Sequence, residues 1–287
     1  MDFRLTEDQR ALRRGVRDLL ARRFDREALR AAVSAPSPSL DRDLWRELGA
    51  AGFFALRLPE AEGGVGLGLP EAVLVFEEAG RALLPGPLVA THGAAGSVPG
   101  AADGSVVVTA VEEGLVPWLD EADVVLGDVS GAVPVRSVDP LTPLHRVPQR
   151  VDPAGESVLL TAAEQVGSSA ATTDAAVSHA RTRSQFGQVI GGFQAVKHLC
   201  AGMLVRTELA RAAVWAAAVT GDPVEIAGAK LLADEAAVGN ARDCLQVHGG
   251  MGFTWEADVH LHLKRAWVRA ELRMPAARAE ETVAAGL

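Results

Sequence analysis

Apolar residues recur at the spacing of an α-helix through most of the first third of the chain. Over residues 5–24 they fall on one helical face, and Thr6 with Gln9 has the spacing of a capping box at the helix start. Residues 40–51 predict a second helix. Pro70 suits the first turn of a further helix, which the sequence PEAVLVFEEAGRALL continues.

The pattern changes between about residues 97 and 153. Short runs of β-branched residues follow one another there, each bounded by Gly, Pro or Asp: SVVVTAV, ADVVLGDV, AVPVRSV and LHRVPQRV. We expect about five short strands, in a small sheet that needs helices packed against it to be stable. After residue 158 the helical pattern returns in alanine-rich runs, and a long helix is expected from about residue 222 to residue 247.

The chain is therefore predicted to be mostly α-helical with a small β domain. Its 287 residues exceed the length of one typical domain. We place an N-terminal helical domain at residues 1–96, a middle β domain at residues 97–153 and a C-terminal helical bundle at residues 154–287.

Composition and charge narrow the class of protein. Hydrophobic residues make up 48% of the chain and charged residues 23%, which excludes a disordered protein. The formal net charge is −9 and no long basic run is present, so we expect neither a nucleic-acid partner nor a membrane partner. The start MDFRLTEDQR does not have the pattern of a signal peptide, and the two cysteines, Cys200 and Cys244, lie in helical segments. We predict a cytoplasmic, reduced protein without a metal site.

Residues 181–194, RTRSQFGQVIGGFQ, break the helical pattern in a way that suits a phosphate. One helix ends here in paired arginines and a glycine-containing connector, and the next helix begins near Phe193. Guanidinium groups would then lie beside free backbone N–H groups, which together can bind a phosphate. The alternative is that Arg183 only neutralises the C-terminus of the first helix.

Residues 246–256, QVHGGMGFTWE, form the second break. Three glycines within four residues allow the backbone to approach a ligand closely. A glycine-rich turn between helices can equally be plain structure, and His248 can equally be a packed histidine. Taken alone, this segment does not decide between a binding loop and a turn.

Together, the motifs resemble those of the acyl-CoA dehydrogenase family, in the same order and over almost the whole chain. They are MDFRLTEDQRALRRGVRDLL, LWRELGAAGFFALRLPEAEGGVGL with FEEAGRALLPGPL, RTRSQFGQVIGGFQAVKHLCAGM, and LQVHGGMGFTWEADVHLHLKRA. The resemblance implies an N-terminal helical domain, a small β domain and a C-terminal four-helix bundle. This order agrees with the one that the hydrophobic pattern predicts.

The resemblance also implies a flavin site that is shared between subunits. In the family, flavin adenine dinucleotide (FAD) lies across a subunit interface, and the two motifs of the bundle hold its ADP and pyrophosphate portion for the adjacent subunit. By position, the residues that match these contacts are Arg183, Phe186, Phe193 and Gln194, followed by Gln246, Val247, His248, Gly249 and Gly250.

Two features of the family are missing. The middle domain is much shorter than in full-length members and lacks the strand and loop with a Thr-Glu-Pro-Gly type motif that lies against the flavin ring. The Glu-Gly-Thr motif with the catalytic base is also absent, and Arg273 or Met274 falls at that position. Other members carry the base at the start of the first bundle helix, near Glu156 and Glu164. The alternative is that Glu164 supports the helix and Glu156 is a solvated loop residue.

Three functions follow from this resemblance. The first is a short subunit of a heterotetrameric, FAD-dependent acyl-CoA dehydrogenase that completes the flavin site of a homologous full-length subunit. Such actinobacterial enzymes act on the side chains of steroid-CoA substrates, and the usual electron acceptor of the family is an electron-transferring flavoprotein. The second is a flavin-free structural subunit. The third is a self-sufficient, homo-oligomeric acyl-CoA dehydrogenase that uses Glu156 or Glu164.

Overall fold

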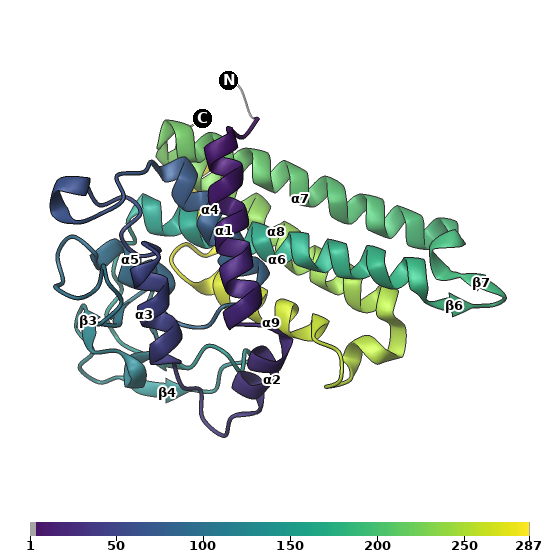
Figure 1. Cartoon of the computed structure of the whole chain (residues 1–287), viewed down its shortest axis with the longest axis horizontal. Helices are drawn as coiled ribbons and strands as arrows, with labels where there is room; N and C mark the ends of the chain where they lie inside the picture. The colour runs from purple at the N-terminus through teal and green to yellow at the C-terminus, as the bar shows by residue number, and fades with distance from the viewer. Residues whose placement is uncertain (1–3, 287) are drawn as a thin grey trace.

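Three long helices of the C-terminal half lie side by side and extend along the longest axis of the molecule (Figure 1). They are α6 (Gly155–Thr182), α7 (Gln194–Thr220) and α8 (Pro223–His248), and the shorter helices α9 (Val259–Glu271) and α10 (Ala276–Ala285) pack against α8. The structure is a computed structural model that describes residues 4–286. The expected long helix over residues 222–247 is confirmed as α8, with Asp222 as its N-cap.

Five shorter helices precede this bundle. They are α1 (Glu7–Arg23), α2 (Arg26–Ser34), α3 (Arg42–Ala50), α4 (Leu69–Arg81) and α5 (Leu88–Ala94), with the single turn η1 (Glu60–Glu62) between α3 and α4. The capping box at the start of α1 is confirmed, because the Gln9 backbone donates to the Thr6 hydroxyl and the Thr6 backbone donates to the Gln9 side chain. Pro70 lies in the first turn of α4, as expected.

Five short strands follow α5. They are β1 (Val108–Ala110), β2 (Leu115–Pro117), β3 (Val124–Leu126), β4 (Val133–Val135) and β5 (Leu144–Arg146), with the turn η2 (Leu119–Glu121) between β2 and β3. The expectation of a single sheet was wrong, since β1 pairs with β3 in parallel whereas β5 lies between β2 and β4 in an antiparallel sheet. Each of these strands is only three residues long, and β2 ends just before Trp118, whose φ is left-handed. The chain therefore changes direction after β2, and the strands form two separate sheets.

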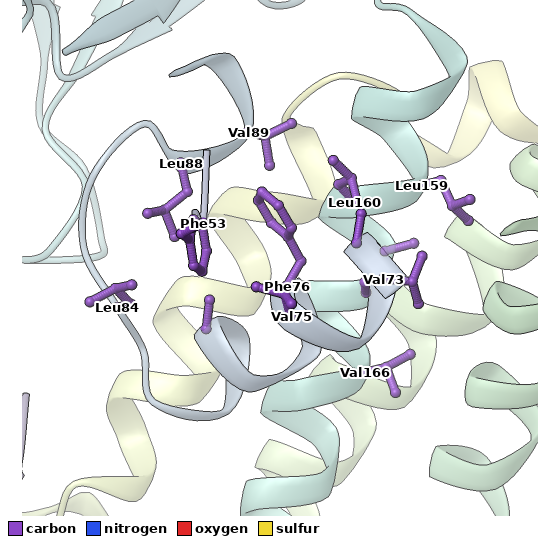
Figure 2. Close-up of a cluster of buried hydrophobic side chains, with 14 of the residues drawn as sticks. Phe53, Val73, Val75, Phe76, Leu84, Leu88, Val89, Leu159, Leu160 and Val166 are labelled. Atoms are coloured by element: carbon purple, nitrogen blue, oxygen red, sulfur yellow. The ribbon is translucent and has the colours of Figure 1, made fainter. Parts of the chain in front are cut away.

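The largest apolar cluster joins the N-terminal helices to the bundle. Phe76 of α4 lies beside Phe53, and Leu160 of α6 packs in the same cluster together with Val89 of α5 (Figure 2). Because this core continues across residues 96 and 153, it does not test the boundaries placed there, and the division into three domains stays a prediction.

Two glycines allow α4 and α6 to cross with their backbones in contact. A Cβ atom on Gly80 would lie 2.0 Å from the Glu164 carbonyl oxygen, and one on Gly167 would lie 1.9 Å from the Glu77 carbonyl oxygen. This close crossing fixes the start of α6, and with it Glu156 and Glu164, against the N-terminal helices.

Within residues 4–286, every helix is too short or too polar to cross a membrane. The cytoplasmic location stays a prediction.

Candidate functional site

The two segments that match the flavin motifs meet at one end of the helical bundle. The connection between α6 and α7 consists of β6 (Ser184–Gln185), β7 (Gln188–Val189) and η3 (Ile190–Gly192), and α8 continues into η4 (Gly249–Phe253). The β6–β7 hairpin projects beyond the bundle (Figure 1). The imidazole rings of His179 on α6 and His248 on α8 stack with their centroids 4.1 Å apart. The structure therefore brings together two segments that lie more than fifty residues apart in the sequence.

Arg183 presents a free guanidinium group at this end. It is the C-cap residue of α6, its side chain is exposed, and it forms no ion pair and no side-chain hydrogen bond within residues 4–286. Phe186 is 92% exposed at the tip of the hairpin, and its ring contacts the edge of the Phe193 ring at a centroid distance of 6.2 Å. Phe193 is the N-cap of α7 and provides no side-chain cap, so the first N–H groups of this helix are free to bind a ligand.

The glycine-rich segment is exposed to solvent at the same end of the helical bundle. Gly249 has a left-handed φ of 62°, and a Cβ atom on Gly249 or Gly250 would meet no atom within 4 Å. Gln246 is exposed and His248 is half-buried, whereas Val247 is buried, so a ligand would reach only the backbone of Val247. The segment thus offers side-chain and backbone donors on an accessible surface.

These residues fit a flavin adenine dinucleotide at its diphosphate. The donor set contains a guanidinium group, the uncapped start of the 27-residue α7 and exposed glycine backbone. Such donors suit a doubly charged diphosphate, because each contributes positive charge or an N–H group. Arg183, Gln194, Gln246, Gly249 and Gly250 would hold the nucleotide. The chemistry of the donors supports this assignment, and the individual contacts stay predictions.

The interior between the strands and the bundle is occupied by buried ion pairs. Three arginines spaced four residues apart on and just after α9 each contact a carboxylate from another segment. The pairs are Arg265–Asp139, Arg269–Glu164 and Arg273–Glu112. The cavity that remains beside them has a volume of about 40 Å³, which is room for water but not for a flavin ring.

Glu164 belongs to this buried cluster. Its Oε1 atom lies 2.7 Å from Arg269 Nη2, and both side chains are buried. Burial lowers the pKa of Arg269 to about 10, against the opposing charge of Glu164. The carboxylate of Glu164 neutralises the arginine in the core. Arg273, one of the two residues that the resemblance places at the position of the family's base, pairs with Glu112 in the same way.

Glu156 lies elsewhere, in a cavity of about 370 Å³ at the start of α6. It forms an ion pair with Arg57, and its Oε1 atom lies 3.4 Å from His92 Nε2. Glu156 is therefore a partly buried helix residue, and the alternative of a solvated loop residue was wrong. Burial raises the pKa of Glu156, but the hydrogen bond to His92 and the charge of Arg57 outweigh it and hold this pKa below its usual value.

Sequence reasoning missed Arg57 and His92. They lie far from Glu156 along the chain. Arg57 falls within one of the quoted family motifs, but no pattern pairs either residue with Glu156, so only the tertiary packing reveals them. Their effect on Glu156 is opposite to that expected of a general base, whose pKa is usually raised toward neutrality.

Comparison with known proteins matches both the N-terminal and the C-terminal part of the chain to family models. Residues 6–106 match the family described as "Acyl-CoA dehydrogenase, N-terminal domain", and residues 156–273 match "Acyl-CoA dehydrogenase, C-terminal domain". Acyl-CoA dehydrogenase IpdE2 of Mycobacterium tuberculosis is 38% identical over an alignment of 299 positions. The alignment covers 93% of this chain and 93% of that protein.

Solved structures show the same fold. The chain superposes on a structure described as the "Tcur3481-Tcur3483 steroid ACAD G363A variant", where ACAD stands for acyl-CoA dehydrogenase. The TM-score is 0.85 and the identity is 25% over 97% of each chain. The ChsE4-ChsE5 complex from Mycobacterium tuberculosis gives a TM-score of 0.84 at 23% identity, covering 99% of this chain and 98% of that one.

Proposed function

Because the chain belongs to the acyl-CoA dehydrogenase family, we propose that it is the short subunit of an FAD-dependent enzyme that introduces an α,β double bond into an acyl-CoA thioester. In this proposal the chain contributes the ADP and pyrophosphate half of the flavin site to a homologous full-length subunit. The bound flavin supplies the hydride acceptor of the reaction. Arg183 and the start of α7 bind the diphosphate, and the open glycines allow the nucleotide to lie against the backbone.

The proposal rests on the contrast between an accessible end of the bundle and a closed interior in the same chain. The end of the bundle has an unpaired arginine and open backbone donors. The interior that would have to hold a flavin ring is closed by three ion pairs and retains only about 40 Å³. A chain with a free diphosphate site, and no room for the ring between its strands and its bundle, fits a flavin whose ring is seated in another subunit.

Exposed apolar side chains support a partner of this kind. Leu204, Val205 and Leu209 are each more than 50% exposed on α7, and Phe186 and Phe253 are exposed at the end of the bundle. Apolar surface on this scale usually marks a protein interface. We propose a heterotetramer with the longer subunit, with an electron-transferring flavoprotein as electron acceptor. The similarity to Tcur3481-Tcur3483, a steroid ACAD, supports a steroid-CoA substrate.

The flavin content of purified protein tests this function. We expect the chain to contain no flavin when it is expressed alone, and one flavin for every two chains when it is co-purified with a homologous full-length dehydrogenase. Absorbance after desalting, divided by the protein concentration, gives the ratio. Flavin on the lone chain would contradict the proposal, and no flavin in either preparation would instead support a purely structural subunit.

A self-sufficient enzyme is the second candidate, because Glu156 faces a cavity of about 370 Å³. The lowered pKa of Glu156 argues against it as the base, so we expect Glu156→Gln to leave dehydrogenation by the complex within about twofold of the unchanged protein. Glu225→Gln, in the first turn of α8, is the matched control. A loss of about a hundredfold or more in Glu156→Gln alone would make Glu156 the base.

A further inference from the structure

The stacked histidines lie between the two segments that the proposed function assigns to the nucleotide. His179 is one helical turn before Arg183 on α6, and His248 immediately precedes Gly249 at the end of α8. Their rings are 4.1 Å apart and inclined by 20°, and both side chains are half-buried. Neither the hydrophobic pattern nor the family motifs single out His179.

The hydrogen bond of His248 determines which of its nitrogens can face a ligand. Nδ1 lies 2.8 Å from the carbonyl oxygen of Cys244, which can only accept, so Nδ1 carries a hydrogen. Nε2 is therefore the nitrogen of His248 that is left to hydrogen-bond a ligand. The ring nitrogens of His179 have no hydrogen-bond partner in the part of the chain that the structure describes. Both rings thus have a nitrogen available for a ligand.

Among the described residues, no carboxylate is one of the groups that act on His179. Besides burial, the groups that act on His179 are His248 and Arg183, and all three lower its pKa. Asp243, five residues before His248 on α8, is already paired with Arg206. The neighbouring thiol cannot supply a negative charge, because burial raises the pKa of Cys244 to about 12. An approaching anion would therefore be the negative charge that acts on His179 beside these groups.

We propose that His179 and His248 form a proton-coupled part of the nucleotide site, in which the pair takes up one proton from solvent when a nucleotide diphosphate binds beside Arg183. No covalent bond forms or breaks, and the proton comes from the buffer. The imidazolium faces the diphosphate, and the second, neutral ring remains stacked against it. The identity of the nucleotide rests on the proposed function, whereas the coupling rests on the geometry of the two rings.

This coupling has a definite sign. A bound dianion stabilises the imidazolium, so the pKa of the pair is higher in the complex than in the free chain. Affinity therefore rises as the pH falls, by at most about tenfold per pH unit for one proton, until the pair is protonated without ligand as well. Between about pH 8 and pH 6 we expect binding to tighten roughly tenfold.

The test uses the full chain and ADP-ribose, whose diphosphate is esterified at both ends and does not titrate in this range. Calorimetry in two buffers of different ionisation enthalpy counts the protons taken up on binding. We expect about one proton for the unchanged chain near pH 7 and almost none when both rings are replaced, by His179→Gln together with His248→Gln. His145→Gln, on β5, is the matched control and should bind as the unchanged chain does.

His179→Arg is a second variant, which separates loss of the proton from loss of folding. Its fixed charge should hold affinity at the low-pH level throughout, which loss of folding could not produce. ADP-ribose that binds equally at both pH values, or that does not bind at all, would overturn the inference. The flavin content of the co-purified complex decides the proposed function separately.

Discussion

Arg183→Ala is expected to remove flavin from the complex with the longer subunit. The side chain is exposed and has no ion pair within the described residues, so its charge is available to a diphosphate. A charge-assisted, bidentate contact of this kind contributes about 2–3 kcal/mol, which corresponds to roughly 30- to 150-fold weaker flavin binding after the substitution. Flavin released during desalting, and the dissociation constant from fluorescence titration, measure the effect.

Arg181→Ala is the matched control for this experiment. Arg181 lies in the last turn of the same helix, is also exposed, and changes the net charge by the same amount when it is replaced. We expect it to retain flavin, and we expect both variants to unfold at the temperature of the unchanged chain. Equal flavin retention in both variants would refute the assignment of Arg183 and leave it as a helix C-cap that neutralises α6.

The helices and the end of the bundle could be predicted from the sequence because their signals are local. The capping box of α1, the proline at the start of α4 and the glycines after α8 each depend on residues within one or two turns. That the hairpin segment and the glycine-rich segment serve one nucleotide was implied only by the resemblance to the family. What the sequence does not show is the stacking of His179 on His248, since it depends on the register of α6 against α8.

The buried ion pairs could not be predicted for a different reason. Arginines spaced by four residues along α9 would ordinarily indicate a solvated helix face. They are buried because each meets a carboxylate that arrives from a strand connection or from α6. No pattern within α9 contains that information. The pairing also fills the space between the strands and the bundle, where only about 40 Å³ remains.

Arg265→Met is expected to destabilise the protein by about 3–5 kcal/mol. The guanidinium group pairs with Asp139 and donates to the carbonyl oxygens of Leu84 and Leu141, and the Asp139 side chain is 0% exposed. Removing the arginine leaves a buried, uncompensated carboxylate, whose cost exceeds the packing that methionine restores. The midpoint and slope of urea unfolding give the change in the free energy of unfolding.

Two further variants identify burial of charge as the cause. Arg278→Met removes an arginine that pairs with Glu113 and Asp152 at a partly exposed site, so we expect a loss below about 1 kcal/mol. Adding Asp139→Asn to Arg265→Met removes the stranded charge while an amide can still hydrogen-bond, and this should recover at least about half of the lost stability. If the double variant is as unstable as Arg265→Met alone, lost packing rather than the buried carboxylate explains the effect, and the ion pairs would no longer account for the closed interior.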